Sequence, residues 1–228
     1  MGQLRVKQVG QFALKYLGHY LLKQVGQLTV KGVGQYGLIY SIADHFIDEA
    51  LYIRIMKFFQ DREEGDQLKK AGIGKSGEFK LDSSVRGDLI YWLDHDKDQQ
   101  LLPFFELMDE LIDAFRKYCF LSLSGSEFHI AKYPAGSYYK RHLDQFNNRS
   151  IRMITVLLYL NENWKKGDGG ELRIFGKGED ILVEPIARRL LLFKSDKIEH
   201  EVLTTEVPRY SLTGWLLRKQ VSIAVLDV

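Results

Sequence analysis

The chain has 228 residues, of which 45% are hydrophobic and 27% are charged, proportions that are ordinary for a globular protein. The formal net charge of +2 gives no reason to expect binding to nucleic acid or to a membrane surface. The single cysteine, Cys119, excludes an intramolecular disulfide and is expected to be a small buried apolar side chain. Without a secretory signal or a transmembrane run, we expect a cytoplasmic protein with one sizeable domain.

Residues 2–41 can be written as a series of octapeptides: GQLRVKQV, GQFALKYL, GHYLLKQV, GQLTVKGV and GQYGLIYS. Such units are too short to form the supersecondary elements of a solenoid, and their regular glycines disfavour a helix. Two interpretations stay open: a tandem DNA repeat that encodes a disordered or adventitious tail, or short strands that pair with another segment. We therefore treat residues 1–40 as a separate N-terminal segment and expect residues 41–228 to carry the function.

Two helices are predicted before the strand-rich half of the chain. From Ile42 to about Arg62 the apolar residues recur at helical spacing, with Asp44 as the expected N-cap. The second helix is expected to run from Pro103, a residue that suits the first helical position, to about Phe120. Each helix has one apolar face, so both are expected to be supports that pack against a sheet.

A polar segment that contains several glycines, residues 65–85, separates the two predicted helices. Its GIGKS fragment resembles part of a phosphate-binding loop. However, Lys69 stands where that motif requires its first glycine, and a helix rather than a strand precedes it. We reject a phosphate-binding loop and expect a mobile surface loop of the kind that often covers an active site.

The pattern changes after Gly125 to short β-rich runs that are interrupted by glycine, proline, asparagine and aspartate. Many short strands with frequent turn signals predict an antiparallel sandwich or barrel. The predicted fold class is therefore α+β with a mainly β core. The predicted strands are EFHIAKY, IRMITVLLYL, ELRIFG, DILVEP, RRLLLF, HEVLTT, YSLTGWLL and VSIAVL.

His142 and Asp144 are the first candidate functional residues, because positions i and i+2 of an extended strand face the same side. His200, at the start of the run HEVLTT, is placed to supply a third ligand from another strand. Two histidines and one carboxylate form the facial triad of non-haem Fe(II) oxygenases. Arg209 offers the planar guanidinium that binds a co-substrate carboxylate in a bidentate manner. His129 alternates with apolar residues and is expected to be a core histidine with satisfied hydrogen bonds.

Several segments of the chain together resemble one known family. Within residues 42–217 the chain is similar to the 2-oxoglutarate- and Fe(II)-dependent dioxygenases, and among them to prolyl 4-hydroxylases of the hypoxia-sensing type. This resemblance implies a double-stranded β-helix (jelly roll) flanked by N-terminal support helices. The segments that carry it are RGDLIYW, KYPAGSYYKRHLD, LYLNENW, GGELRIF, LLFKSD and HEVLTTEVPRYSLTGW.

The resemblance also implies a role for each side chain that matches the family pattern. Iron would be bound by His142, Asp144 and His200. The C5 carboxylate of 2-oxoglutarate would be bound by Arg209 and Tyr159, and the same pocket would be lined by Tyr133, Ser211 and Thr213. The substrate side would be formed by Arg152, Trp215 and Asp88, with Asp88 as a possible partner of Arg152.

The implied activity is hydroxylation of a peptidyl proline in a protein substrate, with O2 and 2-oxoglutarate as co-substrates, succinate and CO2 as products, and ascorbate as an expected reductant. The chain departs from the family pattern at Glu171, which replaces an apolar residue, and in a shorter turn between Tyr133 and His142. Three alternatives stay open: hydroxylation of another residue, hydroxylation of a small molecule, or a non-catalytic jelly-roll binding module. A nucleic-acid dealkylase is disfavoured because Trp215 stands where such enzymes carry a second arginine.

Overall fold

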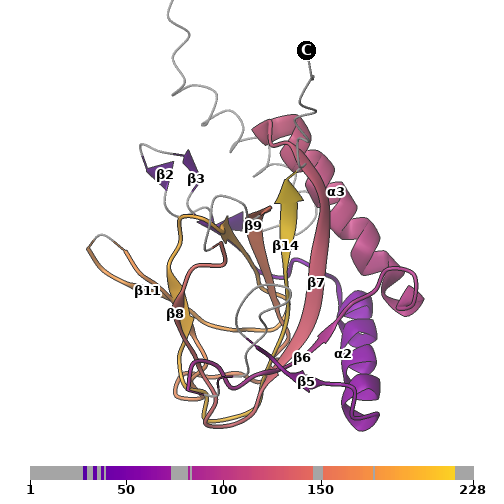
Figure 1. Cartoon of the computed structure of the whole chain (residues 1–228), viewed down its shortest axis with the longest axis vertical. Helices are drawn as coiled ribbons and strands as arrows, with labels where there is room; N and C mark the ends of the chain where they lie inside the picture. Colours follow the sequence, from indigo (N-terminus) through magenta and orange to yellow (C-terminus); the bar gives the residue numbers. More distant parts are fainter. Residues whose placement is uncertain are drawn as a thin grey trace, which may run out of the picture.

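The computed structural model describes residues 40–72, 82, 84–145, 151–176 and 178–218, and the backbone of three short strands between residues 28 and 38. Its core consists of two antiparallel sheets (Figure 1). The large sheet contains, in spatial order, β1 (Leu28–Thr29), β4 (Tyr40–Ala43), β12 (Leu190–Lys194), β9 (Arg152–Tyr159), β14 (Arg209–Arg218), β7 (Leu123–Tyr133), β6 (Leu89–Trp92) and β5 (Lys69–Lys70). The small sheet contains β11 (Ile181–Val183), β10 (Leu172–Ile174), β13 (His200–Val202) and β8 (Tyr139–His142). A separate pair is formed by β2 (Val33–Gly34) and β3 (Gly37–Leu38).

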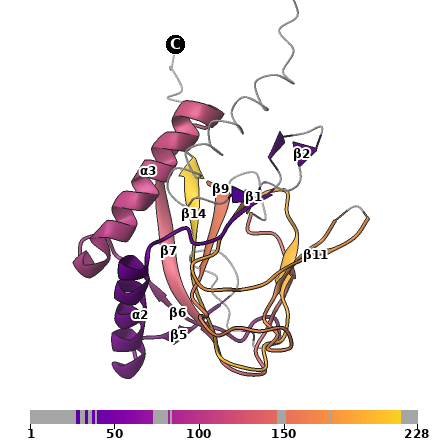
Figure 2. The same cartoon turned by 180° about the vertical axis from the view of Figure 1, so that it is seen from behind.

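The two sheets face each other, and the helices lie against the outer face of the large sheet. Figure 1 and the view from behind in Figure 2 place α2 (Glu49–Glu64) and α3 (Leu102–Cys119) on one side of β7 and β14, with β8 and β11 on the other side. Most of the regular structure is β, and two facing antiparallel sheets of this kind form a jelly-roll core. Within the described ranges, no helix combines the length and the apolar character that crossing a membrane requires.

The central strand β9 shows why this arrangement suits the sequence. Successive side chains of a strand point to opposite faces of the sheet. Ile154, Val156 and Leu158 pack with the helices in one buried cluster, whereas Leu157 and Tyr159 pack with residues of the small sheet in a second cluster. Because both faces of β9 are buried, most of its sequence is a continuous apolar run and not an alternating one.

The two helices differ in how well they follow the sequence-based prediction. α3 covers almost the whole range predicted for the second helix, whereas the first helix begins later than predicted. The segment Tyr40–Ala43 forms β4, which pairs with β12, so long-range strand pairing overrides the local helical spacing. The cap of α2 is Asp48, whose Oδ1 accepts a hydrogen bond from the backbone N–H of Leu51 at 2.8 Å. The predicted cap, Asp44, instead forms an ion pair with Arg189.

Seven of the eight predicted runs contain a strand, namely β7, β9, β10, β11, β12, β13 and β14. The eighth run, VSIAVL, lies outside the described residues. Strands β4, β5, β6 and β8 have no counterpart among the predicted runs, because each is only two to four residues long and depends on its pairing partner. Most of the octapeptide segment also lies outside the described residues, as do residues 73–81 and 83 of the predicted mobile loop, although β1 pairs with β4.

Gly214 on β14 lies so close to β7 that the strand pair has no space for a side chain. A Cβ atom there would be 2.1 Å from Phe128 Cδ1 and 2.2 Å from the backbone oxygen of Glu127. Since this oxygen is held in the sheet, we expect Gly214→Ala to lower the free energy of unfolding by about 3 kcal/mol or more, as measured by chemical denaturation. Gly125→Ala on β7 is the matched control, because an added Cβ there meets nothing within 4 Å. Equal stability of the two variants would contradict the expected clash.

Candidate active site

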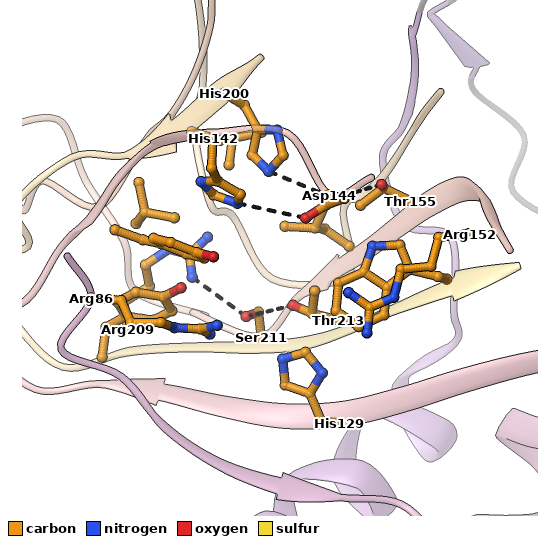
Figure 3. A pocket seen from close by; sticks show the side chains of 16 residues that line it. Arg86, His129, His142, Asp144, Arg152, Thr155, His200, Arg209, Ser211 and Thr213 are labelled. Atoms are coloured by element: carbon orange, nitrogen blue, oxygen red, sulfur yellow. Dashed lines mark hydrogen bonds and ion pairs between the residues drawn. The ribbon is translucent and has the colours of Figure 1, made fainter. Parts of the chain in front are cut away.

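The two candidate histidines meet because their strands pair. His142 ends β8 and His200 begins β13, and the two residues are direct partners in the antiparallel register. Asp144 lies two residues beyond β8 and turns its carboxylate toward both rings (Figure 3). Its Oδ1 is 3.5 Å from His142 Nε2, and its Oδ2 is 3.7 Å from His200 Nε2. One ligand atom from each residue lies within 4.8 Å of the other two, so a single metal ion can contact all three.

Backbone carbonyl groups fix the orientation of both imidazoles. His142 Nδ1 is 2.7 Å from the carbonyl oxygen of Lys140, and His200 Nδ1 is 3.0 Å from that of Ile198. Because a carbonyl oxygen only accepts, Nδ1 carries the proton in each ring and Nε2 keeps its lone pair for a metal. Burial lowers the pKa of His200 to about 4, so this ring is neutral at physiological pH.

One hydroxyl group holds the carboxylate of Asp144, and a second hydroxyl group contacts the first. Thr155 Oγ1 donates a hydrogen bond to Asp144 Oδ2 at 2.6 Å and lies 2.9 Å from Ser195 Oγ. Burial by itself raises the pKa of Asp144, but the neighbouring imidazoles and the Thr155 hydroxyl outweigh it and hold this pKa below its usual value. The site therefore presents an ionised carboxylate and two imidazole lone pairs. This donor set fits Fe(II) and leaves three coordination positions for other ligands.

Arg209 is a buried cation without a carboxylate partner among the described residues, and it is 1% exposed. Its Nε donates a hydrogen bond to the carbonyl oxygen of Gly170 at 2.8 Å, and its Nη1 lies 3.4 Å from Ser211 Oγ. Arg209 Nη2 and the hydroxyl of Tyr159 are both buried, and neither has a hydrogen-bond partner in the described structure. A buried guanidinium is costly unless an anion compensates it, so this corner suits the carboxylate of a ligand.

Gly170, in the segment GGELRIF, makes the position of Arg209 possible. Its φ of +75° lies in the left-handed region, and a Cβ atom there would be 2.8 Å from Arg209 Cδ. Tyr133 and Tyr159 complete the enclosure, with ring centroids 4.9 and 5.2 Å from Arg209 Cζ. Burial raises the pKa of Tyr159 to about 12, so its hydroxyl stays protonated and is able to donate to a carboxylate.

The metal-ligand cluster and Arg209 line the same pocket, with the cluster at one end and Arg209 at the other (Figure 3). A row of polar side chains leads away from Arg209 along β14, since the Ser211 hydroxyl lies 3.2 Å from that of Thr213. Tyr159 contacts Arg209 but does not itself line the pocket. The predicted site residues that line it are His142, Asp144, His200, Arg209, Tyr133, Ser211, Thr213, Arg152 and Trp215.

The expected pair of Arg152 and Asp88 does not form. Asp88 is buried and accepts two hydrogen bonds from Arg86, at 2.7 and 2.6 Å. Arg152 forms an ion pair with Glu127 at 2.6 Å and stacks on Trp215, with its Cζ 3.5 Å from the ring centroid. Arg86 is only two residues from Asp88, so this local pair forms at little entropic cost. Arg86 thus lines the pocket in place of Asp88.

Seven residues that line the pocket had no predicted role in the site: the apolar Leu157, Leu172 and Val202, and the polar or aromatic Arg86, His129, Tyr139 and Thr155. Tyr139 stacks on His142 with ring centroids 3.6 Å apart, and Arg86 Cζ is 4.2 Å from the Tyr139 centroid. The two-residue period of β9 is the signal that indicates Thr155. His129 differs from the expectation of satisfied hydrogen bonds, because its Nδ1 is buried without a partner in the described structure.

Comparison with known proteins assigns this fold and site to one class. Residues 128–217 match the model of the 2OG-Fe(II) oxygenase superfamily. The crystal structure of a Pseudomonas putida prolyl-4-hydroxylase is similar at a TM-score of 0.73 and 32% identity, over 88% of this chain and 98% of that one. The chain therefore belongs to the 2OG-Fe(II) oxygenase superfamily.

Two further proteins place the chain among its relatives. Human prolyl hydroxylase EGLN3 is 39% identical over 142 residues, which is 58% of this chain and 58% of the human protein. The chain thus spans little more than half the length of this curated relative. A Trichoplax adhaerens prolyl hydroxylase, solved with a peptide fragment of the hypoxia-inducible factor, has the same fold, with a TM-score of 0.71 and 24% identity over 95% of this chain and 94% of that one.

Removal of the Asp144 carboxylate is expected to weaken metal binding strongly, because it leaves the two imidazoles without a charged ligand beside them. We expect Asp144→Ala to raise the Kd for Mn(II), a redox-stable probe, by at least about a hundredfold. Isothermal titration calorimetry measures this Kd. Asp96→Ala is the control, because the Asp96 side chain is 98% exposed. Equal Mn(II) affinity of the two variants would mean that the ion binds elsewhere.

Proposed function

We propose that this chain is an Fe(II)- and 2-oxoglutarate-dependent prolyl hydroxylase that acts on a peptidyl proline of a protein substrate. One observation carries the proposal. The cluster of His142, Asp144 and His200 shares a pocket with Arg209, a buried guanidinium that has no carboxylate partner among the described residues. Metal ligands alone do not identify a reaction, whereas metal ligands together with a buried carboxylate-binding cation suit a dicarboxylate co-substrate that chelates the metal.

Each part of the pocket has a defined task in this proposal. Arg209 and Tyr159 bind the C5 carboxylate of 2-oxoglutarate, which supplies the missing counter-charge, and Tyr133, Ser211 and Thr213 line its path toward the metal ligands. His142, Asp144 and His200 hold Fe(II). When bound, iron and 2-oxoglutarate supply the oxidative chemistry, in which 2-oxoglutarate and O2 become succinate and CO2 while one oxygen atom enters a C–H bond of the substrate. Ascorbate, as an external reductant, belongs to the same proposal.

The choice of a peptidyl proline as the substrate residue rests on the relatives and on the apolar side chains that line the pocket. The relatives named above are prolyl hydroxylases, and one of them was solved with a peptide. Trp215 lines the pocket together with the apolar side chains of Leu157, Leu172 and Val202. Apolar side chains of this kind suit a pyrrolidine ring better than they suit a charged side chain.

Two alternatives from different classes lead to different measurements. A 2-oxoglutarate oxygenase that modifies another residue or a small molecule would use the same metal ligands and Arg209. A non-catalytic jelly-roll module would require none of them. The buried polar atoms of Arg209 and Tyr159 disfavour the module, since an unused buried charge only destabilises the fold.

The organisation of the chain belongs to the same proposal. We infer that residues 41–228 form the oxygenase domain and that residues 1–40 form an appended segment. The helices are supports for the large sheet, a role favoured by the contact between Phe104 of α3 and Phe128 of β7, whose ring centroids are 5.0 Å apart. A cytoplasmic location, without a nucleic-acid or membrane partner, is expected from composition.

Arg209→Ala is expected to raise the requirement for 2-oxoglutarate, because the buried carboxylate loses its charged partner at a cost of about 3–5 kcal/mol. This cost corresponds to an increase of more than about a hundredfold in the KM for 2-oxoglutarate, measured by succinate release. Mn(II) affinity is expected to stay unchanged. Arg116→Ala is the control, because Arg116 lies on the exposed part of α3. Equal KM values of the two variants for 2-oxoglutarate would show that Arg209 does not bind this co-substrate.

The proposed activity is tested by incubating iron-loaded protein with host lysate, 2-oxoglutarate and ascorbate, and then mapping +16 Da modifications by mass spectrometry. We expect prolyl modification that is absent with Asp144→Ala. Modification of another residue, or of a small molecule, would select the first alternative. If no succinate is released by wild-type protein with bound Fe(II), the chain is a binding module and the proposal is wrong.

A further inference from the structure

His129 is a buried imidazole in the pocket that the proposed chemistry does not use. It lies on β7 as the direct cross-strand partner of Thr213 and is 4% exposed. Figure 3 shows its ring rising from β7 beside Thr213, among the residues that line the pocket. In the described structure its Nδ1 has no hydrogen-bond partner. This distinguishes it from His142 and His200, whose Nδ1 atoms lie beside backbone carbonyl groups.

Two indoles hold the ring of His129 in place of a hydrogen bond. The centroid of Trp92 is 4.8 Å away, and that of Trp215 is 5.6 Å away in a stacked arrangement with an interplanar angle of 30°. Packing between aromatic rings fixes the orientation of the imidazole. The two indoles therefore fix the direction of Nδ1, although no protein group in the described structure forms a hydrogen bond with it.

The imidazole of His129 is uncharged. Burial, followed by the positive charges of Arg86 and Arg152, lowers its pKa to about 3. A neutral imidazole carries one N–H donor and one lone pair, so it suits an uncharged polar partner.

The neighbouring groups point to the same kind of ligand. The indole Nε1 of Trp215 is a second buried atom without a hydrogen-bond partner in the described structure. The two arginines near His129 have carboxylate partners, since Arg152 pairs with Glu127 and Arg86 pairs with Asp88. His129 and Trp215 thus offer an uncharged hydrogen-bond donor and acceptor beside an apolar surface. A peptide amide, with one N–H and one C=O, has the complementary groups.

2-Oxoglutarate is too short to use His129 while its C5 carboxylate is bound by Arg209. Arg209 pairs with Tyr133 across the β14–β7 ladder, and His129 is four residues from Tyr133 along β7. Four residues of a strand span about 13 Å, whereas the four C–C bonds of 2-oxoglutarate span at most about 6 Å. His129 therefore lies on the substrate side of the pocket.

We propose that His129 is a specificity-determining residue that hydrogen-bonds a main-chain amide of the peptide substrate, close to the hydroxylated residue. This inference rests on the proposed peptide hydroxylase function and adds a recognition element to it. It defines the substrate class as an extended peptide whose backbone, and not a charged side chain, is bound beside Trp215. His129 touches no metal ligand in this scheme and takes no part in the oxidation itself.

The test combines two substitutions of His129 with a backbone scan of the substrate. His129→Met has a similar volume but makes no hydrogen bond, and His129→Asn keeps a polar atom near the position of Nδ1. The probe is a nonapeptide with blocked ends, centred on the residue modified by the wild-type protein, together with versions in which one amide at a time is replaced by an ester. The ester has no N–H and is a weaker acceptor.

We expect His129→Met to lower kcat/KM for the all-amide peptide about five- to tenfold, the effect of one hydrogen bond, mainly through KM. One ester is expected to impose the same loss on the wild-type protein and no further loss on His129→Met. His129→Asn should recover part of the activity. The KM for 2-oxoglutarate and the Kd for Mn(II) should stay unchanged. His95→Met, at a histidine whose side chain is 59% exposed, is the matched control.

Several outcomes would overturn the inference while leaving the proposed function intact. Additive losses from the ester and from His129→Met would show that His129 does not contact the peptide backbone. A changed KM for 2-oxoglutarate with an unchanged peptide KM would assign His129 to the co-substrate. Unchanged kinetics in both variants would mean that Nδ1 of His129 forms no hydrogen bond with the peptide. If wild-type protein releases no succinate, the proposed function fails first, which is a separate result.

Discussion

The large sheet is covered on both faces, by helices on one side and by the small sheet on the other, and the pocket depends on this double burial. A slip of one residue would exchange the side chains that face the helices with those that face the pocket. On β14, Leu212 and Leu216 pack on the helix side, so Arg209, Ser211 and Thr213 must face the pocket. Apolar packing behind the sheet thus fixes the positions of the polar groups in front of it.

The small sheet contributes the metal ligands through a single strand pairing. His142 and His200 become neighbours because β8 and β13 are antiparallel partners at these residues. Their rings are oriented by carbonyl groups two residues earlier in the chain, while the carboxylate of Asp144 is held by Thr155 from the large sheet. The metal site therefore requires both sheets at their correct separation. A substitution in the core between the sheets would alter this separation, and thereby the metal-ligand geometry, without direct contact with the ligands.

Buried polar atoms without partners gather at the pocket. Five such side-chain atoms occur in the described ranges, and four of them belong to Arg209, Tyr159, His129 and Trp215. Since each unpaired buried group costs free energy, a cluster of them indicates where ligands are bound. In the proposed function, Arg209 and the adjacent Tyr159 bind the co-substrate carboxylate, whereas His129 and Trp215 lie on the side proposed for the peptide substrate. The two pairs divide the pocket as the proposed reaction requires.

The sequence by itself determined the mainly β fold, seven of the fourteen strands in the described residues and the three metal-ligand candidates, because these depend on local patterns of residue type and on a short motif. It did not determine β4, the partner of Asp88 or the unsatisfied state of His129. A four-residue strand with helical spacing becomes a strand only when β12 is beside it. In the same way, the hydrogen-bond state of a buried side chain depends on which strands and aromatic rings surround it. Such contacts join residues that are distant in the chain, so only the tertiary structure decided them.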